Sequence, residues 1–254
     1  MTGLRLTVDG PVARVVLDRP EVRNAQTPAM WSALAEFGTA LPPEVRVVVV
    51  SGEGPSFSAG LDRRLIMGEN DLGQEPLLTL GAKPTDEVLE LIATFQSGFS
   101  WLRRPDIVSI AAVQGHAVGA GFQLALACDL RVVTPDARFS MREPSLGLVP
   151  DLGGTKPLVE LIGYSRALEI CTTSRWVEAA EAKELGLANI VVPADELEPT
   201  VKDLSEALLG PLPGAIRETK ALLLGAADRS YDDQLRAERE AQERRLKELL
   251  AAFG

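Results

Sequence analysis

The chain has 254 residues, a length that supports one large domain or one domain with an appendage. Its 36 Asp and Glu outnumber its 26 Lys and Arg, and the net charge of −10 excludes a general nucleic-acid or membrane-surface binder, because those functions need a basic face. One histidine, His116, and two cysteines outside CxxC spacing argue against a metal site such as structural zinc. Isolated cysteines and the lack of an apolar leader favour a reducing compartment, and we expect the cytoplasm.

Strand and helix signals alternate from the N-terminus. Residues 4–8 and 12–17 have apolar patterns around a Gly-Pro turn, which predicts a hairpin. Thr27, followed by a proline and by apolar residues at helical spacing, predicts a capped helix that ends by the prolines at 42–43. Residues 45–51 form an almost unbroken apolar run, which is typical of a strand buried on both faces in a parallel sheet.

The middle of the chain repeats the order of strand, glycine turn and helix. Residues 66–84 are polar and have no clear period, so we expect a mobile excursion with a disordered tip before a helix over 85–104. The pattern then predicts a strand over 107–113, a small-residue helix over 118–127 and a strand over 130–133.

The rest of the chain is mainly helical. This order predicts an α/β protein with a core over 1–192 and a helical region over 193–254. The final helix, over 231–253, is either a solvated helix with one packed stripe or a subunit contact. The other expected elements are helices over 152–162, 165–173 and 179–185, a short strand over 188–192, and two helices before the final one.

Two glycine-rich turns that follow buried strands are the most informative motifs: SFSAGLD at 56–62 and GHAVGAG at 115–121. Neither fits a GxSxG elbow, a dinucleotide fingerprint or a phosphate loop. Gly60, Gly119 and Gly121 lack a Cβ, so a ligand can approach the backbone closely. Together the turns can direct two backbone N–H groups at one oxygen, and the second opens a helix whose dipole adds positive charge. That combination predicts an oxyanion hole, whereas either turn alone is more often an ordinary connection.

These motifs, with others in the same order, resemble the crotonase, or enoyl-CoA hydratase/isomerase, superfamily. The resemblance implies a core of ββα turns in a spiral, a helical C-terminal trimerisation region that also closes the pocket, and a homotrimer or a dimer of trimers. It also implies an acyl-CoA thioester as ligand, with CoA as part of the substrate and no separate cofactor. The segments that carry it are LDRPEVRNA at 17–25, FSAGLD at 57–62, the stretches 105–131 and 139–155, and AAEAKELGL at 179–187.

By motif position, the resemblance assigns the two oxyanion donors to the backbone N–H groups of Leu61 and Ala120. Alanine stands at 120 where many relatives have glycine, and a backbone donor tolerates that change if φ is negative there. The implied CoA-binding set is Arg23 near the phosphates, Ala25 and Ala59 at the adenine, Lys220 as a weaker phosphate contact, and the turn residues Gly60, Asp62 and Gly119.

Glu143 aligns with the second of two catalytic glutamates in the hydratases that the chain resembles. Apolar surroundings would raise its pKa towards the working pH, as a proton shuttle needs; without the family frame it would be taken for a surface glutamate. The first hydratase glutamate falls at Gln123, and an amide cannot accept a proton from water. One carboxylate is enough to move a proton from C2 to C4, so we expect a Δ3,Δ2-enoyl-CoA isomerase of fatty acid metabolism. A weak hydratase and a non-catalytic acyl-CoA-binding protein are the alternatives.

Asp151 is either the N-cap of the following helix or a second carboxylate that assists Glu143. Some relatives of the resembled family use an aspartate in this loop as a nucleophile for dehalogenation, with the help of a histidine from an earlier helix. Residues 96–104 contain no histidine, so dehalogenation is disfavoured. We expect the acyl pocket to be lined largely by the excursion between Ile66 and Pro84, and by Phe95 and Trp101 beyond it.

Overall fold

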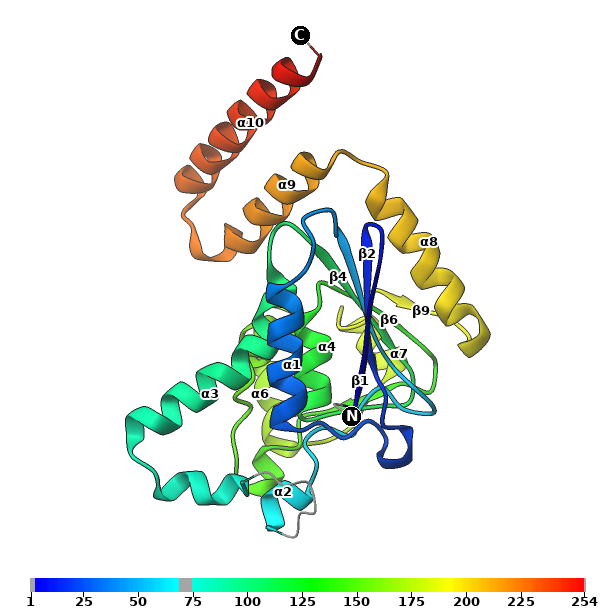
Figure 1. The fold of residues 1–254 in the computed structure, drawn as a ribbon, viewed down its shortest axis with the longest axis vertical. Coiled ribbons are helices and arrows are strands. Elements are labelled where there is room, and N and C mark those ends of the chain that lie inside the picture. The colour runs from blue at the N-terminus through cyan, green and yellow to red at the C-terminus, as the bar shows by residue number, and fades with distance from the viewer. Residues whose placement is uncertain (1–2, 69–74, 254) are drawn as a thin grey trace.

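The computed structural model describes residues 3–68 and 75–253 and has a parallel-sheet core flanked by helices (Figure 1). The main sheet has the strand order β1-β2-β3-β4-β6-β9. β1 and β2 form the predicted antiparallel hairpin, and the other neighbouring pairs of this sheet are parallel. The strands are β1 (Leu4–Asp9), β2 (Val12–Leu17), β3 (Val47–Gly52), β4 (Val108–Val113), β6 (Leu130–Val133) and β9 (Ile190–Val191).

β3 is buried on both faces, as its apolar run predicted. Val48 and Val50 pack into the cluster that holds α1 (Pro28–Thr39) and α3 (Thr85–Ser100). Val47 and Val49 pack instead into the cluster that includes Val201 of α8 (Leu197–Leu209). Successive side chains of a strand point to opposite faces, so one apolar run serves two layers. Figure 1 accordingly has α1 and α3 on one side of the sheet and α8 on the other.

A second, three-stranded sheet was not predicted from the sequence. It contains β5 (His116–Val118), β7 (Arg138–Ser140) and β8 (Val177–Glu178), in that order. Because residues 116–118 pair with β7, the helix expected over 118–127 begins two residues later, as α4 (Ala120–Ala127). This small sheet holds the start of α4 against the strand that leads to Glu143.

The other helices agree with their predicted places and differ at their ends. Thr27 caps α1 as expected, because its Oγ1 accepts a hydrogen bond of 3.3 Å from the Met30 N–H. α3 ends at Ser100 and continues as a 3₁₀ turn through Arg103, and α5 (Thr155–Ile162) begins three residues later than predicted. α6 (Tyr164–Thr173) and α7 (Ala179–Glu184) follow it.

The excursion before α3 is partly described. It contains α2 (Arg64–Met67) and a 3₁₀ segment (Leu77–Ala82). Residues 69–74, within this excursion, lie outside the described residues, so the expectation of a disordered tip stays a prediction.

The C-terminal region is helical, as predicted, and ends in α9 (Pro213–Gly225) and α10 (Tyr231–Phe253). α10 extends away from the sheet and packs beside α9 (Figure 1). Within the described residues of α10 only Ala241 is buried. No helix in the described ranges is long and apolar enough to cross a membrane.

Candidate active site

The two glycine turns meet at the end of the sheet. Ser58 and Ala117 form a β-bridge, with the Ser58 N–H donating to His116 O at 2.8 Å and the Val118 N–H donating to Ser58 O at 3.0 Å. Gly60 has φ +83°, and a Cβ built on it would lie 2.4 Å from Val118 O. Only glycine fits this conformation and this approach, so the residue types that suggested the turns also let them touch.

The backbone N–H groups of Leu61 and Ala120 lie on the facing edges of these turns. In the described residues neither of them donates a hydrogen bond to another protein group. Ala120 is the first residue of α4, so its N–H is one of the unpaired donors at a helix start. The left-handed conformation falls on Gly119, with φ +51°, and Ala120 is not among the residues with positive φ. Alanine is therefore accommodated at this position without backbone strain.

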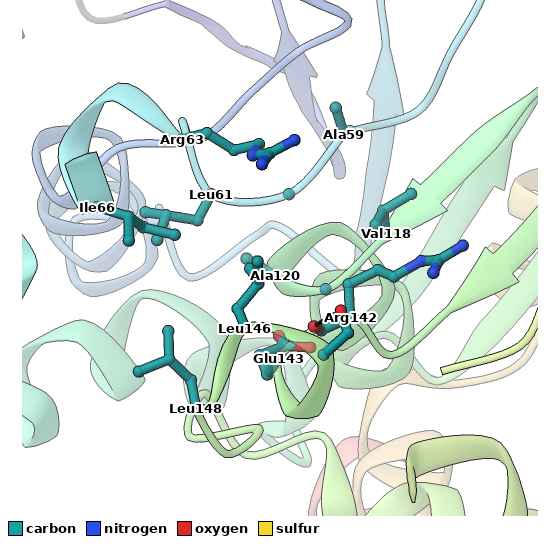
Figure 2. Close-up of a pocket in the computed structure, with 13 residues that line it drawn as sticks. Ala59, Leu61, Arg63, Ile66, Val118, Ala120, Arg142, Glu143, Leu146 and Leu148 are labelled. Carbon is teal, nitrogen blue, oxygen red and sulfur yellow. Dashed lines mark hydrogen bonds between the residues drawn. The ribbon is translucent and has the colours of Figure 1, made fainter. Parts of the chain in front are cut away.

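A cavity of about 390 Å³ opens beside the two turns (Figure 2). Ala59, Gly60, Gly119 and Glu143 are among its lining residues. A second, mostly apolar chamber of about 290 Å³ shares Leu61, Ala120, Glu143 and Leu148 with the first, so the two are adjoining parts of one site. Apolar residues from four segments line the second chamber: Trp31, Leu77, Leu80, Val88, Ile92, Phe95, Leu148, Val149 and Leu152.

The expected acyl-pocket residues divide in the structure. Phe95 lines the apolar chamber and Ile66 lines the outer cavity. Trp101 lines neither, which corrects that expectation. Its ring packs edge-on against Phe37 and its indole N–H donates to Gly98 O at 3.0 Å, so it belongs to the core between α1 and α3.

Glu143 lies three residues after the end of β7 and faces Gly119. A Cβ on Gly119 would approach the Glu143 carboxylate oxygens at 3.2 and 3.4 Å, so the small residue makes room for the carboxyl group. Glu143 Oε2 is buried and has no hydrogen-bond partner in the described residues. Burial raises the pKa of this carboxyl group, and the negative charge of Asp151 adds to the rise. The geometry and the pKa direction both suit a proton shuttle.

Gln123 contacts Glu143 directly, which sequence reasoning had not foreseen. Gln123 is fully buried in α4, and its Nε2 donates to Glu143 Oε1 at 2.7 Å. Its Oε1 accepts the Leu152 N–H at 2.9 Å and the Gly154 N–H at 3.3 Å. The amide thus joins Glu143 to the loop that precedes α5.

Asp151 is not the N-cap of α5, which corrects one of its two predicted roles. The helix begins at Thr155, and Gly154 occupies the cap position without a side-chain bond. Asp151 lines the apolar chamber together with Glu143, and burial raises the pKa of its carboxyl group. Its alternative role, as a second carboxylate beside Glu143, is compatible with this position.

Residues of the implied CoA-binding set lie at the mouth of the site. Gly60, Gly119 and Ala59 line the outer cavity. The Ala59 N–H donates to the backbone carbonyl oxygen of Arg23 at 2.8 Å, and Arg23 is exposed. Ala25, two residues after Arg23 in the chain, is buried.

Asp62 and Lys220 lie in other surroundings. Asp62 is buried and paired with Arg19 at 3.1 Å and Arg64 at 2.8 Å, contacts that fix the first turn. Lys220 donates to Asp129 at 2.7 Å and to Ile107 O at 2.7 Å. It lines a different cavity, of about 530 Å³, beneath α9. Within this single chain Lys220 therefore does not reach the outer cavity.

Two arginines that the sequence analysis had not selected line the outer cavity (Figure 2). Arg63 follows the first turn, and Arg142 precedes Glu143 with its guanidinium 4.8 Å from the centre of the Trp176 ring. Their positions next to two predicted site residues were the available signal. His116, by contrast, contacts Ser56 Oγ at 3.2 Å and packs edge-on against Trp176, as a structural histidine would. The described residues contain no cluster of three or more His, Cys, Asp or Glu that could hold a metal ion.

Comparisons with known proteins agree with this architecture. The sequence model of the Enoyl-CoA hydratase/isomerase family matches residues 7–251. The chain is 30% identical to a peroxisomal Delta(3,5)-Delta(2,4)-dienoyl-CoA isomerase of Arabidopsis thaliana, over 91% of this chain and 84% of that protein. It is 32% identical to a carnitinyl-CoA dehydratase of Salmonella enteritidis, over 92% of this chain and 84% of that protein.

A solved structure with higher identity comes from Thermobifida fusca YX. It is a "putative enoyl-CoA hydratase" in complex with CoA, with a TM-score of 0.92, 51% identity, and coverage of 98% of this chain and 95% of that one. A second structure from the same organism, also described as a "putative enoyl-CoA hydratase" and in complex with acetoacetyl-CoA, has a TM-score of 0.91 and 51% identity. It covers 97% of this chain and 96% of that one. The family match across the chain and the shared fold lead to one conclusion: this chain belongs to the enoyl-CoA hydratase/isomerase family of acyl-CoA enzymes, in the crotonase superfamily.

Proposed function

We propose that the protein is an enoyl-CoA isomerase that moves a double bond from C3 to C2 with Glu143 as its single acid/base. One observation carries the proposal: Glu143, whose buried Oε2 has no hydrogen-bond partner in the described residues, lines the same cavity as Leu61 and Ala120. The place of a second glutamate is taken by Gln123, whose amide cannot accept a proton.

The proposed reaction begins with Glu143 Oε2 as base. The C2–H bond of a 3-enoyl thioester breaks, an O–H bond forms on Oε2, and the electron pair spreads over C2 to C4 and the thioester oxygen. The N–H groups of Leu61 and Ala120 stabilise that oxygen, each by about 3 kcal/mol in a site of this kind. Oε2 then returns the proton to C4 as the π pair moves between C2 and C3. Atoms and charge balance without water or a second base.

The two chambers would divide the substrate between them. The apolar chamber suits an acyl chain, because its lining is largely aliphatic and aromatic. The outer cavity suits the thioester and the pantetheine arm, with Arg23, Arg63 and Arg142 near its mouth as cations for CoA phosphates. The Thermobifida fusca relative, which is described in complex with CoA and with acetoacetyl-CoA, supports this class of substrate.

Hydration is the second candidate, and Asp151 is the observation that favours it. Asp151 lines the apolar chamber with Glu143, and a carboxylate there would act as base for a water molecule. The similarity to a dehydratase points in the same direction. A non-catalytic acyl-CoA binder remains the third candidate, on the ground that Gln123 replaces a glutamate.

Parallel incubations with 3-enoyl-CoA and 2-enoyl-CoA discriminate these candidates. We expect conjugation of the first and little hydration of the second. Glu143→Gln should lower kcat by about 10²- to 10⁴-fold, because it removes the base. Glu198→Gln, at an exposed ion pair with Arg14, is the control and should leave kcat unchanged. Hydration alone would favour the second candidate, and no turnover of either substrate at high enzyme concentration would refute both enzyme candidates.

We also infer that the protein assembles as a trimer or a dimer of trimers through its C-terminal helices. Leu246, Leu250 and Phe253 of α10 are 57%, 73% and 80% exposed in the single chain. Apolar side chains this exposed on one helix are typical of an interface. Light scattering coupled to gel filtration should give a mass of three or six chains, and a monomer at micromolar concentration would refute the inference.

A further inference from the structure

We propose that Gln123 is a positioning residue that confines proton transfer to one oxygen of Glu143, Oε2. The inference rests on the proposed function, because it concerns the same acid/base group. It adds a role for a residue that the sequence presents only as a missing glutamate.

The orientation of the Gln123 amide is fixed by the loop before α5. Its Oε1 receives the N–H groups of Leu152 and Gly154, at 2.9 and 3.3 Å. Both partners are donors, so the opposite orientation would set the NH₂ group against two N–H groups. The NH₂ group must therefore face Glu143, and the oxygen that it contacts must be an acceptor.

That requirement holds in both protonation states of Glu143. Oε1 accepts from Gln123 Nε2 at 2.7 Å, so a proton on the carboxyl group has to reside on Oε2. Oε2 is also the oxygen without a partner in the described residues, and Glu143 lines both chambers. One oxygen is thus held as an acceptor while the other is left to take and return the proton.

Two glycines pack closely against this pair of side chains. A Cβ on Gly154 would lie 2.7 Å from Gln123 Cγ, and a Cβ on Gly119 would lie 3.2 Å from Glu143 Oε1. The backbone of the two glycines therefore presses against both members of the pair. An error of about 1 Å in the placement of a reacting group can cost about 100-fold in rate, so a fixed carboxyl group has catalytic value.

The amide also tunes the acidity of Glu143. Burial raises the pKa of Glu143, whereas the hydrogen bond from Gln123 opposes that rise because it favours the charged form. Loss of the amide should raise the pKa further. The direction of this shift separates loss of the hydrogen bond from a simple packing defect, because a defect that admitted water would reduce the burial of Glu143 and lower its pKa instead.

The test compares Gln123→Met with wild type. Methionine fills similar space without donating a hydrogen bond, so we expect kcat to fall about 10- to 100-fold and KM to change little. The acid limb of the kcat/KM profile should move up by about one pH unit. Gln114→Met is the matched control, because the Gln114 amide is likewise hydrogen-bonded, as a donor to the backbone carbonyls of Gly52 and Gly54, but Gln114 does not line the site. An unmoved acid limb and a kcat within twofold of wild type would overturn the proposal.

Gln123→Glu provides a second variant that keeps the acceptor for Leu152 and Gly154. Its other oxygen would face Glu143 Oε1 at the present 2.7 Å, so the two carboxyl groups would share a proton and titrate as a pair. We expect two acid limbs in place of one. A single limb at the wild-type pH would count against the fixed orientation.

A measurement without turnover distinguishes failure of this inference from failure of the proposed function. Carboxyl ¹³C resonances of glutamate-labelled protein, with Glu143 assigned through Glu143→Gln, report its titration directly. If wild type has no isomerase activity but Gln123→Met still raises the Glu143 pKa, the function is wrong and the positioning role stands. If the titration does not move, the positioning role is wrong whatever the activity.

Discussion

Replacing Gly60 by alanine tests whether the close approach of the two turns sets the catalytic rate. The new Cβ would lie 2.4 Å from Val118 O, whereas ordinary contact begins at 3.4 Å, so the turns must separate by about 1 Å. Leu61 and Ala120, whose N–H groups form the proposed oxyanion hole, flank this contact. Loss of one donor in such a hole costs about 3 kcal/mol of barrier, and a 1 Å displacement about 100-fold in rate. We therefore expect kcat to fall about 100-fold.

Part of any effect would come from backbone strain, because Gly60 has φ +83°. Gly10→Ala is the matched control, since Gly10 has φ +52° but no atom within 4 Å of its built Cβ. Each substitution should lower the free energy of unfolding by about 1 kcal/mol through strain. Only Gly60→Ala should also lower kcat in the 3-enoyl-CoA assay. Equal kcat values for the two variants, both folded by circular dichroism, would refute the reasoning.

Three further predictions concern charged groups. Lys220→Met should lower the free energy of unfolding by about 3 kcal/mol, because it leaves Asp129 without its buried ion-pair partner. Lys202→Met, which breaks an exposed ion pair, should change that free energy by less than about 0.5 kcal/mol. Urea unfolding measures both values. The hydrogen bond from Arg64 is the main cause that lowers the pKa of Asp62 below its ordinary value of 3.8. The charged carboxylate therefore stabilises the fold fully at pH values above 3.8, and this stabilisation is lost as the pH falls through the lower pKa of the folded state. Asp62→Asn should therefore destabilise by about 2 kcal/mol at pH 7, and a deficit that persisted unchanged at pH 2 would contradict this sign. Asp151→Asn should shift the acid limb of kcat/KM to lower pH, because it removes a negative charge that raises the pKa of Glu143, the proposed base; an unshifted limb would show that the two groups are not coupled.

Local patterns were enough to predict several elements. The hairpin of β1 and β2, the Thr27 cap of α1 and the two-faced burial of β3 were all confirmed. Each depends on neighbours in the chain: a turn between apolar segments, a side chain that bonds the N–H three residues on, and an uninterrupted apolar run. The family was also recognisable, because its motifs are spread in order along the chain.

The elements that the sequence did not predict depend on distant partners. β5, β7 and β8 have two or three residues each, too few for a periodic signal, and they exist because they pair with one another. α4 begins two residues later than predicted for the same reason, because residues 116–118 pair with β7. Lys220 matched a motif weakly, yet 91 residues separate it from the Asp129 that holds it.

The site divides along the same line. The sequence by itself determined which chemical groups the site contains. These are glycines that allow backbone donors to converge, one glutamate, and a glutamine at the position of the first hydratase glutamate. Only the tertiary structure decided which atoms act, because Gln123 meets Glu143 across 20 residues and also holds two N–H groups of a third segment. Residue identity sets what a group can donate or accept, whereas the direction of an amide and the free oxygen of a carboxylate follow from what packs around them.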